Sequence, residues 1–221
     1  LMSRPGDLKP IPFIEDLAVP VDRLGEFVRE MERILSAHGT QGDFYAHASA
    51  GCLHIRPLID LKTTHGVAQM RSIAEAAVDL VLRLGGAISG EHGDGLARSE
   101  WLERAYGTEI TAAFRRLKDS VDPRGILNPG KILDSPPMDT HLRFGSGYQS
   151  ETWSPVFSFA SQRGLAGAVE MCNGAGVCRK ADGVMCPSFQ ATAQEMHSTR
   201  GRANLFRALL AGKQASPGIS M

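Results

Sequence analysis

Long apolar runs are missing from this sequence. No window approaches the ~18 to 20 apolar residues that a membrane-spanning helix needs. The first residues also lack the apolar core of a signal peptide. We therefore expect no transmembrane segment and a cytoplasmic location, free or peripheral at the inner membrane.

An excess of charge of one sign is missing too. Lysine and arginine together number 24, aspartate and glutamate also number 24, and the formal net charge is zero. Nucleic-acid surfaces and electrostatic membrane anchors carry a clear basic excess. The composition therefore argues against a nucleic-acid partner, and a highly charged partner would have to be recognised locally.

Cysteine is scarce and unevenly placed. Three of the four cysteines, Cys172, Cys178 and Cys186, crowd into one short stretch. In a reducing compartment such a group favours metal or cluster ligation over disulfides. The fourth, Cys52, stands alone and is expected to pack as a small hydrophobic side chain.

What is present is the composition of an ordinary globular protein. With 43% hydrophobic and 22% charged residues, 221 residues are enough for one large domain or two small ones. In the first part the patterns predict a strand over residues 11–19, a helix with its apolar stripe over 24–35, two strands joined by a turn within 44–57, and a helix over 64–84. This order predicts an α+β fold, an antiparallel or mixed sheet covered by helices.

The rest of the chain is predicted to be mostly helical. Residues 100–106 and 109–121 read as two helices broken at Gly107, and a further helix is expected over residues 198–210. Residues 134–167 are rich in Pro, Gly, Ser and Thr, with one short extended piece at residues 156–159.

The run at residues 85–95 is too rich in glycine for a helix or an ordinary strand, and it holds Glu91 and His92 side by side. Neighbours in an extended segment point to opposite sides, so one can bind a metal while the other faces a substrate. The flanking glycines, Gly90 and Gly93 among them, let a planar ligand approach without Cβ clashes. The plainer alternative is a mobile surface loop with an incidental Glu-His pair.

A second pair of candidate ligands is His47 and His54. Their separation of seven is odd, so on one straight strand they would face opposite ways, and only a turn or bulge near Gly51 could bring them together. Two imidazoles and a carboxylate, with Glu91 as the obvious third ligand, suit a catalytic divalent metal such as zinc. Taken without the Glu-His run, the pair is better interpreted as ordinary core or surface histidines.

Three ordered motifs together resemble a known family. They are the histidine pair, Ile-Ser-Gly-Glu-His-Gly-Asp-Gly at residues 88–95, and Asp-Pro-Arg-Gly-Ile-Leu-Asn-Pro-Gly-Lys at residues 122–131. At these intervals they resemble the C-terminal half of the FAD-linked oxidases. The narrower resemblance is to the D-2-hydroxy-acid dehydrogenase branch, which includes D-lactate, glycolate and D-2-hydroxyglutarate dehydrogenases. It covers about residues 11–133 and implies that family's cap domain.

The resemblance implies roles for the candidate residues. His47, His54 and Glu91 would hold a divalent metal, with zinc expected, that binds the carboxylate and α-hydroxyl of a 2-hydroxy acid. His92 would take the hydroxyl proton while the α-hydrogen leaves as hydride to the flavin. A metal that lowers the energy of the alkoxide allows an imidazole titrating near neutrality to take that proton.

The resemblance also implies an FAD cofactor. Asn128 is similar to the family residue that lies close to the flavin ring, and Gly90 and Gly93 are the further cofactor contacts that we expect. On its own, the Asn128 motif would read as a plain Asn-Pro turn.

The chain departs from the family pattern in two places. Between His47 and His54 the usual Asp and Asn are missing, and Arg56 stands where much of the family has an asparagine near the substrate. Arg56 could clamp a second carboxylate bidentately, which would suit 2-hydroxyglutarate rather than lactate; equally, it reads as a surface charge.

The spacing Cys172-x5-Cys178-x7-Cys186-Pro resembles a ferredoxin-type run for a 4Fe-4S cluster, with Ala175 in place of one cysteine. Three thiolates are too few, so further ligands are expected beyond this chain. The alternatives are a structural zinc site completed by His197, and thiols that stay reduced and unligated.

We therefore expect a cap domain at residues 1–134, a linker at 135–167, and the start of a ferredoxin-like iron-sulfur domain at 168–221, small and mostly helical. The chain reads as a fragment, inactive alone, of an enzyme that passes electrons from FAD through iron-sulfur clusters to an unknown acceptor. Its expected partners are the FAD-binding domain and a downstream iron-sulfur domain. The alternatives are an FAD-linked oxidase of another substrate class and a non-catalytic metal or electron-transfer module.

Overall fold

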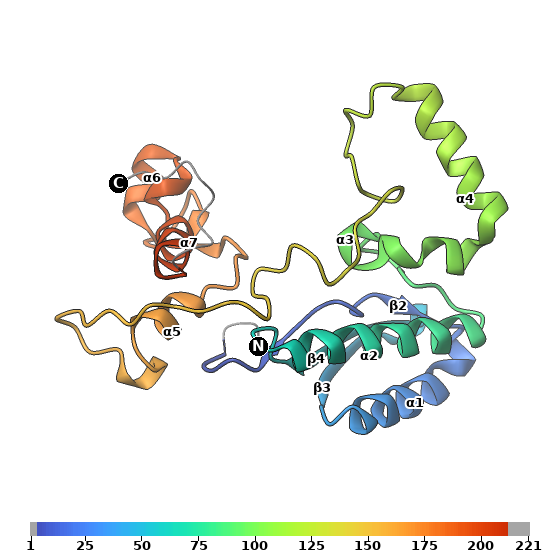
Figure 1. The fold of residues 1–221 in the computed structure, drawn as a ribbon, viewed down its shortest axis with the longest axis horizontal. Coiled ribbons are helices and arrows are strands. Elements are labelled where there is room, and N and C mark those ends of the chain that lie inside the picture. The colour runs from blue at the N-terminus through green and yellow to red at the C-terminus, as the bar shows by residue number, and fades with distance from the viewer. Residues whose placement is uncertain (1–3, 212–221) are drawn as a thin grey trace. The chain divides into compact units, whose positions relative to one another are not determined.

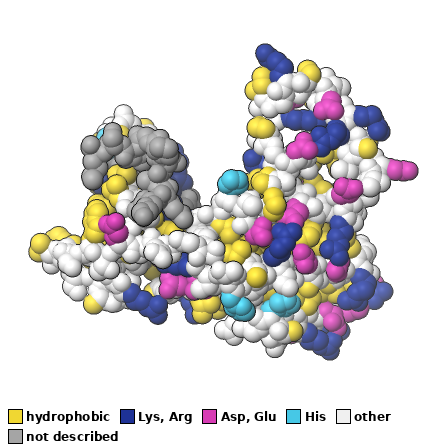
Figure 2. Space-filling model, in the orientation of Figure 1, with side chains coloured by type: hydrophobic (Ala, Val, Ile, Leu, Met, Phe, Trp, Pro, Cys, Tyr) yellow, Lys and Arg dark blue, Asp and Glu magenta, His cyan; other side chains and the backbone are white. Residues whose placement is uncertain are grey.

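The computed structural model describes residues 4–211. One compact unit is formed by Lys9–Ser146, and a second by residues 147–211 together with 4–8. The division between the units falls inside the segment 135–167 that we expect to be a linker. Among the described residues no helix is both long and apolar enough to cross a membrane. On the face drawn in Figure 2, basic and acidic side chains are interspersed.

The sheet of the first unit is built around strand β4 (Cys52–Ile59). Strand β3 (Gly42–His47) runs antiparallel to it as the other arm of a hairpin. Two short strands, β1 (Lys9–Pro10) and β2 (Leu17–Ala18), pair antiparallel with the two ends of β4. The strand pair predicted within residues 44–57 is thereby confirmed.

Helices α1 (Leu24–Ala37) and α2 (Thr64–Arg83) lie side by side along this sheet (Figure 1). Both were predicted from apolar residues at helical spacing, which place one apolar stripe toward the sheet. Thr63 caps α2 by accepting a hydrogen bond from the amide of Gly66 at 2.9 Å. The α+β fold expected from the sequence is confirmed. Fully buried members of the core between helices and sheet are Phe27, Met31, Ile55, Ile59, Ile73, Ala77 and Val81.

The chain then passes through the glycine-rich run into α3 (Gly95–Arg98) and α4 (Leu102–Val121). Gly107 has φ 79° and ψ 167°, so α4 is kinked there, as the sequence predicts. Leu102 is buried in the core before the kink, whereas Leu117 and Val121 are exposed after it.

The second unit contains α5 (Leu165–Glu170), α6 (Pro187–Thr192) and α7 (Thr199–Leu210). The expected helix over residues 198–210 is confirmed, and Ser198 caps it by accepting a hydrogen bond from the amide of Gly201 at 2.8 Å. Short 3-10 helices in the described chain are Val21–Arg23, Ala48–Ala50, Ser99–Trp101, Ala160–Gln162, Val177–Arg179 and Glu195–His197.

Two predicted extended segments are wrong in extent. The amide of Ile11 still donates to the carbonyl oxygen of Pro57 at 2.9 Å. Residues 12–16 then leave the sheet between β1 and β2, because Pro12 cannot donate a ladder hydrogen bond and the acids that follow bind other partners. Residues 156–159 form no strand in the described structure. Val156 there is 100% exposed, so an extended pattern without a buried face has no sheet to join.

Candidate metal and catalytic site

The β3–β4 hairpin brings the two candidate histidines to one face of the sheet. His47 pairs with Cys52 and Tyr45 pairs with His54, so the alternation of side chains places both imidazoles on the same side, 5.2 Å apart between ring centroids. The turn depends on Gly51, which has φ 68°, and a Cβ there would lie 1.9 Å from the carbonyl oxygen of Val19. The turn expected near this glycine is confirmed.

The glycine-rich run delivers Glu91 to the same point. Its Oε1 lies 3.2 Å from Nε2 of His47 and 3.2 Å from Nε2 of His54. Nε2 of His92 lies 3.3 Å from the same oxygen. The structure thus gathers all four residues that the sequence singled out, from β3, from β4 and from the segment before α3.

In two of these rings, the hydrogen bond made by Nδ1 determines whether Nε2 bears a proton or a lone pair. Nδ1 of His54 donates to the backbone oxygen of Glu15 at 2.7 Å, and Nδ1 of His92 donates to Glu15 Oε1 at 2.8 Å. A neutral ring with its proton on Nδ1 has a lone pair on Nε2. These lone pairs face a carboxylate oxygen, and such acceptors repel unless a cation or additional protons lie among them.

The side chains around Glu91 are of the kinds that hold a divalent metal. Among the described residues, two groups have donor atoms that all lie within 4.8 Å of one another: Asp16, Cys52, His54 and Glu91, and Glu15, His54 and His92. His47 joins them through its 3.2 Å approach to Glu91. Two imidazole nitrogens and one carboxylate oxygen are ligands that zinc accepts, and three protein ligands leave a position for a substrate. The hydrogen bond from His54 to Glu15 is the kind of outer contact that fixes the orientation of a ligating imidazole.

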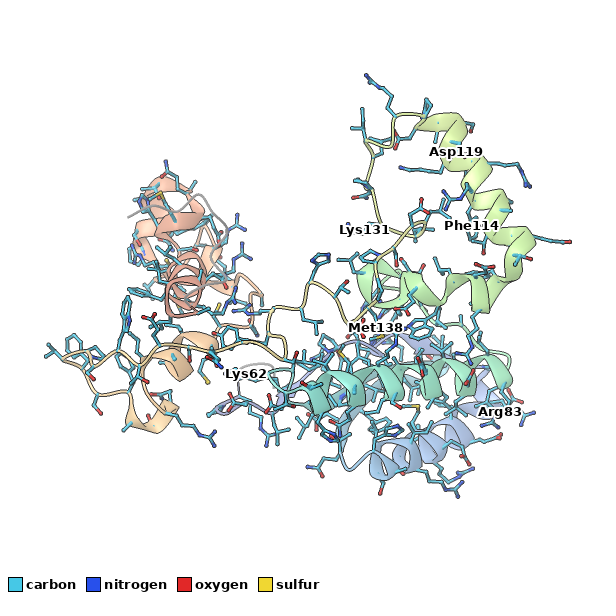
Figure 3. All side chains as sticks on the ribbon, viewed as in Figure 1. Lys62, Arg83, Phe114, Asp119, Lys131 and Met138 are labelled. Carbon is cyan, nitrogen blue, oxygen red and sulfur yellow. The ribbon has the colours of Figure 1, made fainter. Side chains whose placement is uncertain are left out.

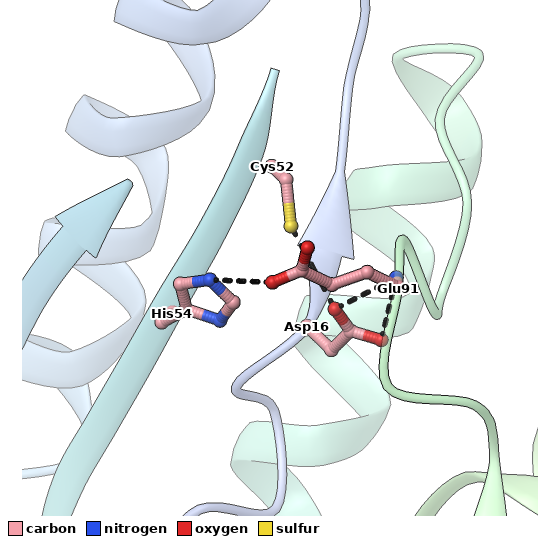
Figure 4. Close-up of side chains that lie close together, drawn as sticks. All are labelled: Asp16, Cys52, His54 and Glu91. Atoms are coloured by element: carbon pink, nitrogen blue, oxygen red, sulfur yellow. Dashed lines mark hydrogen bonds and ion pairs between the residues drawn. The ribbon is translucent and has the colours of Figure 1, made fainter. Parts of the chain in front are cut away.

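The sequence analysis missed two residues of this site, Glu15 and Asp16. Asp16 is 0% exposed, and its carboxylate accepts hydrogen bonds from the hydroxyl of Ser89 at 2.5 Å and from the amide of His92 at 2.8 Å. Figure 4 shows it beside Glu91, Cys52 and His54. The sequence feature that could have pointed to Glu15 and Asp16 is the pair of adjacent acids within the otherwise apolar segment of residues 11–19.

Burial and hydrogen bonding shift three pKa values here. Burial alone would raise the pKa of Asp16, but hydrogen bonds from Ser89, His92 and Glu91 outweigh it and leave that pKa lowered. The hydrogen bond to Glu15 raises the pKa of His92, against the opposing effect of burial. Burial, with the charge of Asp16, raises the pKa of the Cys52 thiol to about 11. Cys52 is buried, as expected for a small hydrophobic side chain, and its thiol also donates a hydrogen bond to Asp16 at 3.6 Å.

Arg56 lies on the same hairpin, next to these groups. It donates to the hydroxyl of Tyr45 at 2.6 Å, lies over the Tyr45 ring, and approaches Glu15 Oε2 at 3.5 Å. Its guanidinium is therefore held at the edge of the histidine cluster.

The residues expected to contact FAD lie in two places. Gly90 packs tightly, since a Cβ there would lie 3.0 Å from Sγ of Cys52, and Gly93 has φ 76° beside His92. Asn128, with φ 46°, lines a different cavity of about 340 Å³ between α4 and the loop that follows it. Figure 3 labels Phe114 and Lys131 on its two walls.

Two of the three clustered cysteines, Cys178 and Cys186, contact the N-terminal end of α7. Sγ of Cys178 accepts from the amide of Arg200 at 3.3 Å, and both Cys172 and Cys178 lie within electrostatic reach of that arginine. Hydrogen bonding to Thr199 lowers the pKa of the Cys186 thiol, although burial opposes this. All three are free thiols.

Comparison with known proteins adds two findings. Residues 1–132 match the family model described as FAD linked oxidases, C-terminal domain. The chain is 36% identical to D-2-hydroxyglutarate dehydrogenase of Escherichia coli, covering 96% of this chain and 21% of that protein. It is 35% identical to the Pseudomonas putida protein of that name, covering 91% and 20%.

Other relatives align with less of this chain. The glycolate oxidase subunit GlcD of Bacillus subtilis is 31% identical, covering 60% of this chain and 28% of that protein. The probable mitochondrial D-lactate dehydrogenase of Danio rerio is also 31% identical, covering 54% and 24%. The chain thus spans about a fifth to a quarter of the length of these relatives.

Proposed function

The chain belongs to the FAD linked oxidases, as their C-terminal domain, and on that premise we propose that it is the metal-carrying cap of a flavin-dependent dehydrogenase. The enzyme would oxidise a D-2-hydroxy acid to the 2-oxo acid. Because the chain spans about a fifth of its D-2-hydroxyglutarate dehydrogenase relatives, we include an FAD-binding domain and a downstream iron-sulfur domain in the proposal as partners.

One observation carries this proposal: a single oxygen of Glu91 lies within 3.3 Å of three imidazole nitrogens. We assign His47, His54 and Glu91 as ligands of a divalent metal, with zinc expected. Bound there, the cation would stabilise negative charge on the substrate hydroxyl oxygen, and the bound flavin would accept the hydride.

In this proposal His92 takes the proton from the substrate hydroxyl. Its Nδ1–H is held by Glu15, so Nε2 is the nitrogen available to accept a proton. In the full enzyme the substrate C–H bond would break as the C=O bond forms: His92 would receive the hydroxyl proton, and a bound flavin would supply the acceptor for the hydride.

The substrate that we propose is 2-hydroxyglutarate. The relatives with that name align over both units, at 91–96% of this chain, whereas the Danio rerio and Arabidopsis thaliana relatives named D-lactate dehydrogenase align over 54%. Arg56 would bind the second carboxylate, which requires it to exchange its contact with Tyr45 for the substrate. In the full protein, Arg56→Ala should lower turnover of 2-hydroxyglutarate far more than that of D-lactate. An unchanged ratio removes Arg56 from substrate recognition.

We further propose that Cys172, Cys178 and Cys186 contribute to a 4Fe-4S site. The N-terminal end of α7 and the guanidinium of Arg200, which also pairs with Glu195, lie beside the thiols, and positive charge there would favour the net negative charge of a thiolate-ligated cluster. Electrons would pass from FAD to this cluster and then to an acceptor.

The test is turnover of D-2-hydroxy acids by the full protein with a dye as electron acceptor. We expect a chelator to abolish activity, zinc to restore it, and His54→Ala to eliminate it by loss of a ligand. His65→Ala, an exposed histidine on α2, is the matched control and should retain activity. Turnover that survives both chelation and His54→Ala would contradict the proposal.

A further inference from the structure

We propose that Asp16 is the positioning residue of this site, because it holds the backbone from which the Glu91 and His92 side chains project. This inference rests on the proposed function, since it gives Glu91 the role of a ligand. It adds a residue that neither the family motifs nor the histidine cluster include.

Three consecutive amides converge on this one residue. The amide of Gly90 donates to the backbone oxygen of Asp16 at 2.7 Å. The amide of Glu91 donates to the carboxylate at 3.1 Å and 3.2 Å, and the amide of His92 at 2.8 Å. Successive amides that point at one anion form a concavity that selects negative charge, and here Asp16 supplies that charge from within the protein.

Besides Asp16, the segment is held by the His92 side chain on Glu15 and by Arg98, which donates to the carbonyl oxygen of Gly93. Gly90 and Gly93 give its backbone wide conformational freedom, and an unsupported segment would lose that freedom at a cost when Glu91 is brought to the histidines. Ser89 at the start of the segment also donates to Asp16, at 2.5 Å. The adjacent β2 residue Ala18 bridges to Ala87, which anchors the same segment one step earlier.

Asp16 lies near the candidate metal ligands, but its carboxylate oxygens are occupied by hydrogen bonds to other groups. A carboxylate oxygen of Asp16 lies within 4.8 Å of donor atoms of Cys52, His54 and Glu91. Both oxygens of Asp16 already accept hydrogen bonds, Oδ1 from Glu91 and Cys52, and Oδ2 from Ser89, His92 and Glu91. The geometry therefore makes Asp16 a support for the ligand rather than a ligand itself.

The experiment compares wild type, Asp16→Asn and a matched control in the intact protein. Hydrogen–deuterium exchange by mass spectrometry is followed in peptides covering residues 88–94, and Co²⁺ binding is followed by its visible absorption. The asparagine cannot accept with its NH₂ group, so we expect faster exchange in these peptides and a Co²⁺ affinity lowered by about 10- to 100-fold, the usual loss when outer support of a metal ligand is removed. Asp60→Asn is the control, because Asp60 also accepts a backbone amide, that of Lys62 at 2.9 Å, away from the site.

A second variant guards against failure of Asp16→Asn to fold. Ser89→Ala removes one hydrogen bond and keeps the carboxylate, so it should show the same pattern to a smaller degree. Unchanged exchange in residues 88–94, or faster exchange with wild-type Co²⁺ affinity and spectrum, overturns the positioning role. If wild type itself binds no Co²⁺, the ligand set of the proposed function is wrong, and the exchange data still decide whether Asp16 holds the segment.

Discussion

The imidazoles of His47, His54 and His92 surround Oε1 of Glu91, and Glu15 binds the Nδ1 atoms of two of them, His54 and His92. The backbone oxygen of Glu15 accepts a hydrogen bond from His54, and its carboxylate accepts one from His92. One residue thus fixes the tautomers of a proposed ligand and of the proposed base. The two adjacent acids thus have different roles: Glu15 binds the imidazole rings, and Asp16 binds the backbone amides of Glu91 and His92.

Replacement of Glu15 should change the titration of His92. The hydrogen bond and charge of Glu15 raise the pKa of His92, so Glu15→Ala should return that pKa toward its ordinary value. Glu15→Gln keeps an acceptor for Nδ1 but removes the charge, and should give an intermediate pKa. Imidazole signals in an NMR titration of the metal-free protein measure this shift, and identical curves for all three proteins would refute the assignment.

The same interaction predicts a direction for stability. A folded-state pKa raised above the unfolded value of about 6.5 stabilises the fold at pH below that value, and the contribution is lost as pH rises through the raised pKa. The difference in urea midpoint between wild type and Glu15→Ala should therefore be larger at about pH 5.5 than at about pH 9. The opposite trend would contradict the sign of the shift.

At this scale the sequence predicted some residues of the site and missed others. Glu91 and His92 could be singled out because a Glu-His pair inside a glycine-rich run is unusual. Asp16 could not, because its partners lie 36 to 76 positions away and its neighbours read as an apolar strand. Side-chain periodicity carries no information about a hydrogen bond made to a distant backbone.

Among the elements, the long helices were predicted well, whereas the edge strands and the short helices α5 and α6 were not. Helices α1, α2 and α7 follow apolar spacing that one helix face imposes by itself. The segment of residues 11–19 alternates like a strand, yet only Leu17–Ala18 pairs within it. The other residues of this segment do not pair because proline cannot donate a ladder hydrogen bond and because the acids bind partners that lie far away in the sequence.

The β3–β4 turn gives a sharp prediction about an element. Gly39 and Gly51 both have φ 68°, but a Cβ at Gly39 meets nothing within 4 Å whereas one at Gly51 would lie 1.9 Å from the carbonyl oxygen of Val19. Gly39→Ala should cost roughly 1–2 kcal/mol of unfolding free energy for the left-handed backbone alone. Gly51→Ala should cost clearly more and should also weaken metal binding, because the hairpin sets the spacing of His47 and His54. Denaturant unfolding and Co²⁺ titration measure both effects, and equal costs would contradict the turn's role.

At the scale of the whole molecule, an apolar side of α4 and the loop after it is exposed within the unit Lys9–Ser146. Leu117, Val121 and Leu127 are each more than 60% exposed and line the cavity that holds Asn128. Since the family model is a C-terminal domain of FAD linked oxidases, we propose that the FAD-binding domain covers this side. The sequence predicted the helix but could not show that its apolar face is left exposed within the unit Lys9–Ser146.

This surface predicts different outcomes in the chain and in the full protein. Leu117→Glu should change the stability of the 221-residue chain by no more than about 0.5 kcal/mol, as exposed substitutions do. In the full protein it should lower FAD retention and activity, because a carboxylate would be buried at the interface. Glu109→Gln on the exposed surface of α4 is the control. Equal FAD content in wild type and Leu117→Glu would argue against docking here.

The cysteine cluster predicts the metal content of the full protein. Cys178→Ser should lower iron and acid-labile sulfide, since it removes a thiolate at the α7 end, whereas Cys52→Ala should not. Elemental analysis with the iron-sulfur absorption spectrum distinguishes the two variants. Iron content unaffected by Cys178→Ser would leave the thiols without a cluster role.

Zinc K-edge X-ray absorption of the zinc-loaded full protein tests the central claim most directly. If His47, His54 and Glu91 hold the metal, the nearest shell contains nitrogen and oxygen at about 2.0–2.2 Å, and it disappears in His54→Ala. A shell of sulfur at about 2.3 Å, which would place zinc on the cysteines, or a nitrogen shell that survives His54→Ala, would contradict the account.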